Sequence, residues 1–130
     1  MEYLIDTHCW LWCWESPEKL GADAEKIIRD PKVKVYFSAA SAWELAIKVK
    51  LGKLKIQESL DSFINSRLKN EAFTSLPIEI SHATKAYALP LHHRDPFDRI
   101  LIAQAYIEDL CFITADSQIK SYSIKILFIP

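Results

Sequence analysis

Two aspartates each follow a short apolar run of the kind that forms a buried strand. Asp6 comes directly after Tyr3–Ile5, and Asp116 comes just after Cys111–Thr114. Unbroken runs of aromatic and β-branched residues are typical of parallel sheets that are covered on both faces. Ligands of open α/β sheets bind beyond the carboxyl ends of the strands, so we expect both carboxylates at one edge of a sheet.

Two further acids lie in predicted helices that begin near the same edge. Glu44 belongs to a nearly uncharged stretch, residues 37–47, whose alanines and leucine predict burial. Asp98 lies in the first turn of a helix that has Asp95 as its N-cap and Pro96 at its first position. All four acids can therefore meet at one edge.

Each acid also has a purely structural explanation. Asp6 is suited to cap the helix that follows it, and Glu44 stands three residues after Ser41, which is the spacing of a capping box. Asp98 is favoured in a first turn by the helix dipole, and Asp116 is a common turn residue. Taken singly, these explanations account for each residue.

Taken jointly, the four carboxylates predict a bound cation. Two like charges about 4 Å apart repel by roughly 4 kcal/mol at an effective dielectric of about 20, so a buried acidic cluster needs compensation. Oxygen ligands without nitrogen or sulfur favour Mg²⁺ or Mn²⁺ over zinc. Such an ion activates water and shares its coordination shell with phosphate, which fits hydrolysis of a phosphodiester.

The elements that must position these acids alternate between strands and helices. This alternation predicts an α/β fold, a three-layer α/β/α sandwich with a central parallel sheet. The expected strands are residues 3–5, 33–37, 73–76, 111–114 and 124–129, and the expected helices are residues 9–14, 22–29, 39–51, 60–68, 80–87 and 95–107, with a short helix after 116.

The composition predicts a single domain over residues 1–130. The chain is 50% hydrophobic and 25% charged, with a formal net charge of −1, which gives no overall basic character for nucleic acid. It shows neither a signal peptide nor an apolar run of about 18 residues, so we expect a cytoplasmic protein without a membrane partner. Its three cysteines lack a metal or disulfide spacing and are expected to be reduced packing residues.

A local basic patch contrasts with this neutral average. Lysines are dense just after the Glu44 helix, and two arginines flank Asp98: the set is Lys48, Lys50, Lys53 and Lys55, with Arg94 and Arg99. These side chains either bind backbone phosphates of a nucleic acid or form a solvated helix end, and the sequence leaves both explanations open.

Five segments resemble one known family over nearly the whole chain. They are LIDTH (4–8), SAWELAIK (41–48), KLGKL (50–54), HRDPFDR (93–99) and LIAQA (101–105). Their sequence and spacing resemble the PIN domain, in particular the VapC-type toxins of bacterial type II toxin–antitoxin pairs. The resemblance implies an Mg²⁺- or Mn²⁺-dependent endoribonuclease, a cognate antitoxin that covers the active-site groove, and a homodimer.

The acids of that family correspond here to Asp6, Glu44, Asp98 and Asp116, with Thr7 as a supporting polar residue. We hypothesise that Asp6 and Asp98 are the principal metal ligands. Glu44 would then bind the ion directly or through water, and Asp116 would orient the attacking water or a second ion.

Histidines are not required for chemistry that uses oxygen ligands. His93 is expected to be a surface or structural residue rather than a contact of the scissile phosphate, and Asp95 is expected to be a helix cap. The tryptophans are mostly core by default, although one or two of them suit a protein interface.

Three other functions compete with the ribonuclease hypothesis. The first is a related Mg²⁺-dependent DNA nuclease, and the second is a catalytically silent PIN module that binds RNA or protein. The third is a phosphatase or phospho-acceptor domain. It is disfavoured because its nucleophile loop typically has a second acid two residues after the first, where this chain has His8.

Overall fold

A computed structural model describes all residues, 1–130, around one five-stranded parallel sheet. The strands are β1 (Tyr3–Ile5), β2 (Val35–Ser38), β3 (Thr74–Leu76), β4 (Cys111–Thr114) and β5 (Ile126–Phe128). Their spatial order is β3-β2-β1-β4-β5, and every neighbouring pair is parallel. The strand that carries Asp6 is therefore the central one, beside the strand that precedes Asp116.

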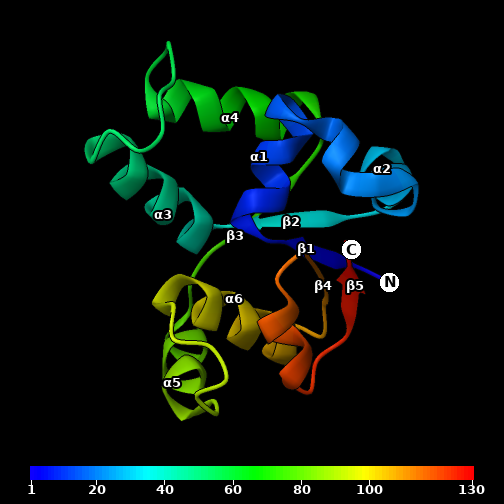
Figure 1. Cartoon of the computed structure of the whole chain (residues 1–130), viewed down its shortest axis with the longest axis vertical. Coiled ribbons are helices and arrows are strands. Elements are labelled where there is room, and N and C mark those ends of the chain that lie inside the picture. The colour runs from blue at the N-terminus through cyan, green and yellow to red at the C-terminus, as the bar shows by residue number, and fades with distance from the viewer.

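Helices cover both faces of the sheet, as Figure 1 shows. The α-helices are α1 (Thr7–Glu15), α2 (Gly21–Arg29), α3 (Ala39–Lys50), α4 (Leu60–Asn70), α5 (Ile80–Ala88) and α6 (Pro96–Ile107), with short 3₁₀ turns η1 (Pro17–Leu20) and η2 (Ser117–Ser121). Helices α1, α2 and α4 lie on one side of the sheet, and α5 and α6 lie on the other. The predicted α/β/α sandwich is confirmed.

The strands are apolar on both faces because each face has its own core. Ile5 and Ile113 belong to a cluster with Trp10 of α1, whereas Leu4 and Phe112 belong to a second cluster with α6. Successive residues of a strand point to opposite faces, so an unbroken apolar run serves both clusters at once. The sheet is thereby fixed, and its carboxyl edge becomes a rigid platform for polar side chains.

Most predicted elements are present with shifted ends. The second strand begins at Val35 rather than at residue 33, because the Val33 N–H donates to the Asp30 carbonyl within a turn (3.1 Å). Gly52 follows α3 with a φ of 75°, as expected of a glycine that ends a helix.

Two remaining expectations concern the cysteines and the membrane. All three cysteines are free and buried, as predicted. Burial raises their pKa values, in the case of Cys13 to about 12, which leaves the thiols unreactive. None of the helices combines the length and the apolar character that crossing a membrane requires.

Candidate metal centre

Asp6 stands where the central strand β1 ends and α1 begins. Its Oδ1 accepts a hydrogen bond from the backbone N–H of Cys9 (2.9 Å), and its Oδ2 accepts one from Thr114 Oγ1 (2.6 Å). Asp6 is thus the cap of α1, but carboxylate oxygens keep lone pairs beyond one hydrogen bond each. Burial raises the pKa of Asp6 despite these two donors. A buried carboxyl held by two fixed donors is poised to accept a cation.

Asp98 projects from the first turn of α6, and Asp95 caps that helix. Asp95 Oδ1 accepts hydrogen bonds from the backbone N–H groups of Phe97 (2.8 Å) and Asp98 (3.4 Å), which confirms Asp95 as the N-cap. Burial, followed by the negative charges of Asp95, Asp6 and Glu44, raises the pKa of Asp98 to about 7, while His93 acts in the opposite direction. Negative charge therefore predominates around this partly buried carboxyl.

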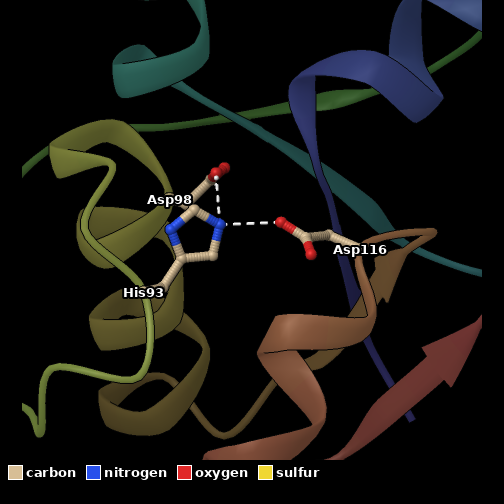
Figure 2. A group of neighbouring side chains, drawn as sticks. All are labelled: His93, Asp98 and Asp116. Carbon is tan, nitrogen blue, oxygen red and sulfur yellow. Dashed lines mark hydrogen bonds and ion pairs between the residues drawn. The ribbon is translucent and has the colours of Figure 1, made fainter.

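Asp116 meets Asp98 through an imidazole, as Figure 2 shows. His93 Nε2 lies 2.7 Å from Asp116 Oδ2 and 3.1 Å from Asp98 Oδ2. The possible ligand atoms of these three residues all lie within 4.8 Å of one another. The predicted turn role of Asp116 is also present, because its Oδ1 accepts the Gln118 N–H at the start of η2 (2.9 Å).

Of the two roles expected for His93, surface or structural, the structure shows the structural one. Its side chain is buried, with 8% of the residue exposed, and it lies between two of the four predicted acids rather than on the surface. No spacing rule identifies it, because it belongs to the connection between α5 and α6. The signal available in the sequence was its position two residues before the Asp95 cap.

Glu44 is buried in α3 and has one unpartnered oxygen. Its Oε2 pairs with Lys48 Nζ one turn later (3.3 Å), whereas its Oε1 is buried without a hydrogen-bond partner. Leaving a buried carboxylate oxygen unsatisfied is costly, and such an atom is a natural cation ligand. The negative charge of Glu44 contributes to the raised pKa of Asp98.

Two hydroxyl groups connect the elements that carry the acids. Thr114 Oγ1 donates to Asp6 Oδ2 and accepts the Asp116 N–H (3.1 Å), so it links the ends of β1 and β4. Thr7 Oγ1 donates to Ser41 Oγ (2.9 Å) and thereby joins α1 to the start of α3, one turn before Glu44. Thr7 was predicted to support the site, whereas Thr114 was not singled out.

The basic side chains predicted to contact nucleic acid are in different situations. Lys48 is engaged by Glu44, whereas Lys50, Lys53, Lys55 and Arg94 are exposed. The remaining member, Arg99, is corrected to a structural role, because its guanidinium donates to the carbonyl groups of Ala86, Leu89, Pro90 and His93 at 2.7–3.2 Å. Arg99 holds the connection between α5 and α6 in place.

The donor set fits a hard divalent cation. The carboxylates come from four different parts of the chain. The pKa of Asp98 is raised by burial and then by the charges of its acidic neighbours, and Glu44 Oε1 lacks a partner. Mg²⁺ and Mn²⁺ prefer carboxylate oxygens and compensate their mutual repulsion. The acids of Asp6, Glu44, Asp98 and Asp116 would hold such an ion.

The fold and the site together define a class: parallel-sheet α/β proteins with an acidic centre beyond the carboxyl ends of the strands. The family model of the PIN domain matches residues 3–125. The chain therefore belongs to the PIN domain family.

One curated relative is similar over part of the chain. Ribonuclease VapC16 of Mycobacterium tuberculosis is 38% identical over 73 residues, which cover 53% of this chain and 50% of that protein. The chain thus matches about half the length of this relative.

Three solved structures share the fold over nearly their full length. VapBC2 of Rickettsia felis, bound to a DNA fragment from its promoter, has a TM-score of 0.73 at 14% identity and covers 100% of both chains. A toxin–antitoxin complex of Klebsiella pneumoniae has a TM-score of 0.67 at 16% identity and covers 99% of this chain and 98% of that one. FitAcB of Neisseria gonorrhoeae has a TM-score of 0.67 at 19% identity, with 96% of both chains covered.

Proposed function

We propose that this chain is a metal-dependent endoribonuclease and the toxin of a toxin–antitoxin pair. The observation that carries the proposal is the acidic centre, where Asp98 and Asp116 converge on one imidazole and the charges of Asp6 and Glu44 act on Asp98. A relative that is 38% identical over 73 residues bears the name ribonuclease, which supports RNA as the substrate.

The cofactor in this proposal is Mg²⁺ or Mn²⁺. When bound, the ion would lower the pKa of a coordinated water and offset charge on the scissile phosphate. The chain itself contributes carboxylates whose positions are fixed by hydrogen bonds before the ion binds. Asp6 is fixed by Cys9 and Thr114, and Asp116 is fixed by the start of η2. Preorganised ligands lose little conformational freedom when the ion enters.

RNA would be held by exposed cations beside the acidic centre. Lys50 and Lys53 follow Glu44 at the end of α3, and Arg94 precedes the Asp95 cap, so both groups flank the acids along the chain. Lys48 pairs with Glu44 in this structure and would exchange that partner for a phosphate once the carboxylate binds a cation. These contacts would be independent of RNA sequence.

The proposed protein partner is a cognate antitoxin, and a homodimer is the proposed assembly. Similar solved structures are toxin–antitoxin complexes, which supports an antitoxin here. Helix α3 and its C-cap carry an exposed apolar strip suited to such a partner, with Trp43 62% exposed and the C-cap residue Leu51 63% exposed. We also propose that residues 1–130 form a single domain.

The test is cleavage of a panel of structured and single-stranded RNAs by the purified chain in Mg²⁺, Mn²⁺ or EDTA, with matched DNA strands alongside. We expect RNA to be cut in the presence of metal and left intact in EDTA. The Asp6→Asn and Asp98→Asn variants should be inactive under the same conditions. Cutting of DNA alone would replace the proposal by a DNA nuclease, and cutting in EDTA would contradict the metal mechanism.

A further inference from the structure

The imidazole of His93 lies inside the acidic centre, where it has two possible tasks. It could offer a nitrogen ligand to the ion, or it could donate a hydrogen bond to the carboxylates that bind the ion. The difference matters because imidazole nitrogen suits Zn²⁺ and late transition metals, whereas an oxygen-only set suits Mg²⁺ and Mn²⁺. Which nitrogen carries the proton decides between the two tasks.

The backbone next to His93 fixes its tautomer. The N–H of Asp95 points at His93 Nδ1 from 3.1 Å, so Nδ1 must be an acceptor without a proton. A neutral imidazole then carries its proton on Nε2. This nitrogen faces Asp116 Oδ2 at 2.7 Å and Asp98 Oδ2 at 3.1 Å, and both of these atoms are acceptors.

The same hydrogen bond opposes metal ligation by the ring. A Nε2 ligand needs its lone pair, which would move the proton to Nδ1, directly opposite the Asp95 N–H. Two donors would then face each other at 3.1 Å in a buried place. The capping conformation of Asp95, which starts α6, would have to break to allow this arrangement.

A frame of further hydrogen bonds fixes the backbone from which the ring projects. The His93 N–H donates to Tyr122 Oη (2.9 Å), and this hydroxyl donates to the Pro90 carbonyl (2.7 Å). Arg99 also donates to the carbonyl groups of His93 and Pro90. Both the N–H and the carbonyl group of His93 are therefore held by hydrogen bonds.

We propose that His93 is a positioning residue, whose Nε2–H holds the Asp98 and Asp116 carboxylates in place for the cation without becoming a ligand itself. The ligand set is then made of oxygen atoms alone. The part of this inference that concerns the cation rests on the proposed function, whereas the tautomer and the hydrogen bonds belong to the metal-free protein.

The tautomer is tested by long-range ¹H–¹⁵N NMR on the ¹⁵N-labelled, metal-free chain. His93 should show a protonated Nε2 and an unprotonated Nδ1. His82 provides an internal reference with the same hydrogen-bond pattern, since its Nδ1 accepts the Glu79 N–H (2.9 Å). A proton on Nδ1 of His93 would overturn the inference, whatever the protein cleaves.

The positioning role is tested by calorimetric Mn²⁺ titration of His93→Ala and His93→Gln. The alanine variant should bind Mn²⁺ about 10-fold to 100-fold more weakly than the wild type, which is the usual cost of losing a partner of a metal ligand. Glutamine can supply an N–H donor close to the position of Nε2 and should restore most of the affinity. Equal losses in both variants would contradict a donor role.

His92→Gln is the matched control, because the neighbouring exposed histidine undergoes the same change outside the acidic centre. It should retain the wild-type affinity for Mn²⁺. A chain that gives the expected tautomer and variant series but cleaves no RNA would leave the positioning role intact and refute the proposed function alone.

Discussion

Two buried histidines of this protein share one hydrogen-bond pattern and differ in their surroundings. In both rings Nδ1 accepts a backbone N–H, from Glu79 for His82 and from Asp95 for His93, and Nε2 faces a carboxylate. His82 meets one acid, Glu108, whose side chain is 41% exposed.

His93 instead meets two acids, Asp98 and Asp116, within reach of the charges of Asp6 and Glu44. A single carboxylate beside a buried imidazole is therefore enough to join two elements. His82 joins α5 to the end of α6 in this way. The accumulation of carboxylates distinguishes the candidate site, because only an excess of negative charge demands a cation.

The largest expected difference between the two places is in catalysis. Asp98→Asn should lower the rate of RNA cleavage on the order of 10³-fold, because it removes a proposed metal ligand. Glu108→Gln makes the same chemical change beside His82 and should leave the rate unchanged. Parallel rate measurements on one RNA substrate check this, and equal losses in both variants would erase the proposed distinction.

The second difference is in the pH dependence of stability without metal. Asp98 has a pKa of about 7 in the folded chain against an ordinary value of 3.8, so the native state binds more protons than the unfolded state between these values. The free energy of unfolding should therefore fall as pH rises from about 4 to about 7, by on the order of 3 kcal/mol.

Urea unfolding in EDTA across this pH window measures the effect. Asp98→Asn should flatten the profile and stabilise the metal-free protein at the alkaline end, since it removes a carboxylate repelled by Asp95, Asp6 and Glu44. Glu108→Gln should keep the wild-type slope. An unchanged slope in Asp98→Asn would show that another group is responsible.

The third difference is in what each histidine stabilises. His82→Ala should lower the free energy of unfolding by about 2 kcal/mol, because it opens a cavity at a fully buried side chain and leaves the N–H of Glu79 without its partner. Affinity for Mn²⁺ should remain that of the wild type. Calorimetry and urea unfolding of one preparation check both statements, and a loss of Mn²⁺ affinity would contradict the separation.

The smallest expected effect concerns exposed lysines that lie away from both His82 and His93. A Lys50→Ala/Lys53→Ala double variant should reduce the slope of log affinity for single-stranded RNA against log salt by about 1.4, since each phosphate contact contributes about 0.7. Lys26 and Lys32 are also exposed and precede β2, whose start lies at the opposite edge of the sheet. Their double alanine variant should leave the slope unchanged.

Local patterns were enough to predict the scaffold and the shared edge to which its strand ends point. Strand Cys111–Thr114 and the Asp95 cap depend on neighbouring residues, and parallel strands necessarily bring the ends of β1 and β4 to one edge. The convergence of Asp98 and Asp116 follows from these local features.

Contacts between distant segments could not be predicted in this way. Thr114 reaches Asp6 across 108 positions of sequence, and the place of His93 depends on Tyr122, 29 positions away. Arg99 looked like an exposed cation, yet its guanidinium is surrounded by carbonyl groups that the turn between α5 and α6 directs toward it. Such contacts depend on tertiary packing rather than on local propensity.

The central claim is that the acidic centre binds a hard cation, and calorimetric titration of the metal-free chain with Mn²⁺ tests it most directly. We predict saturable binding to the wild type and to Glu108→Gln, and a loss of at least about 100-fold in affinity in Asp6→Asn and Asp98→Asn. Wild-type affinity in Asp98→Asn, or a failure of the wild type to bind Mn²⁺, would contradict it.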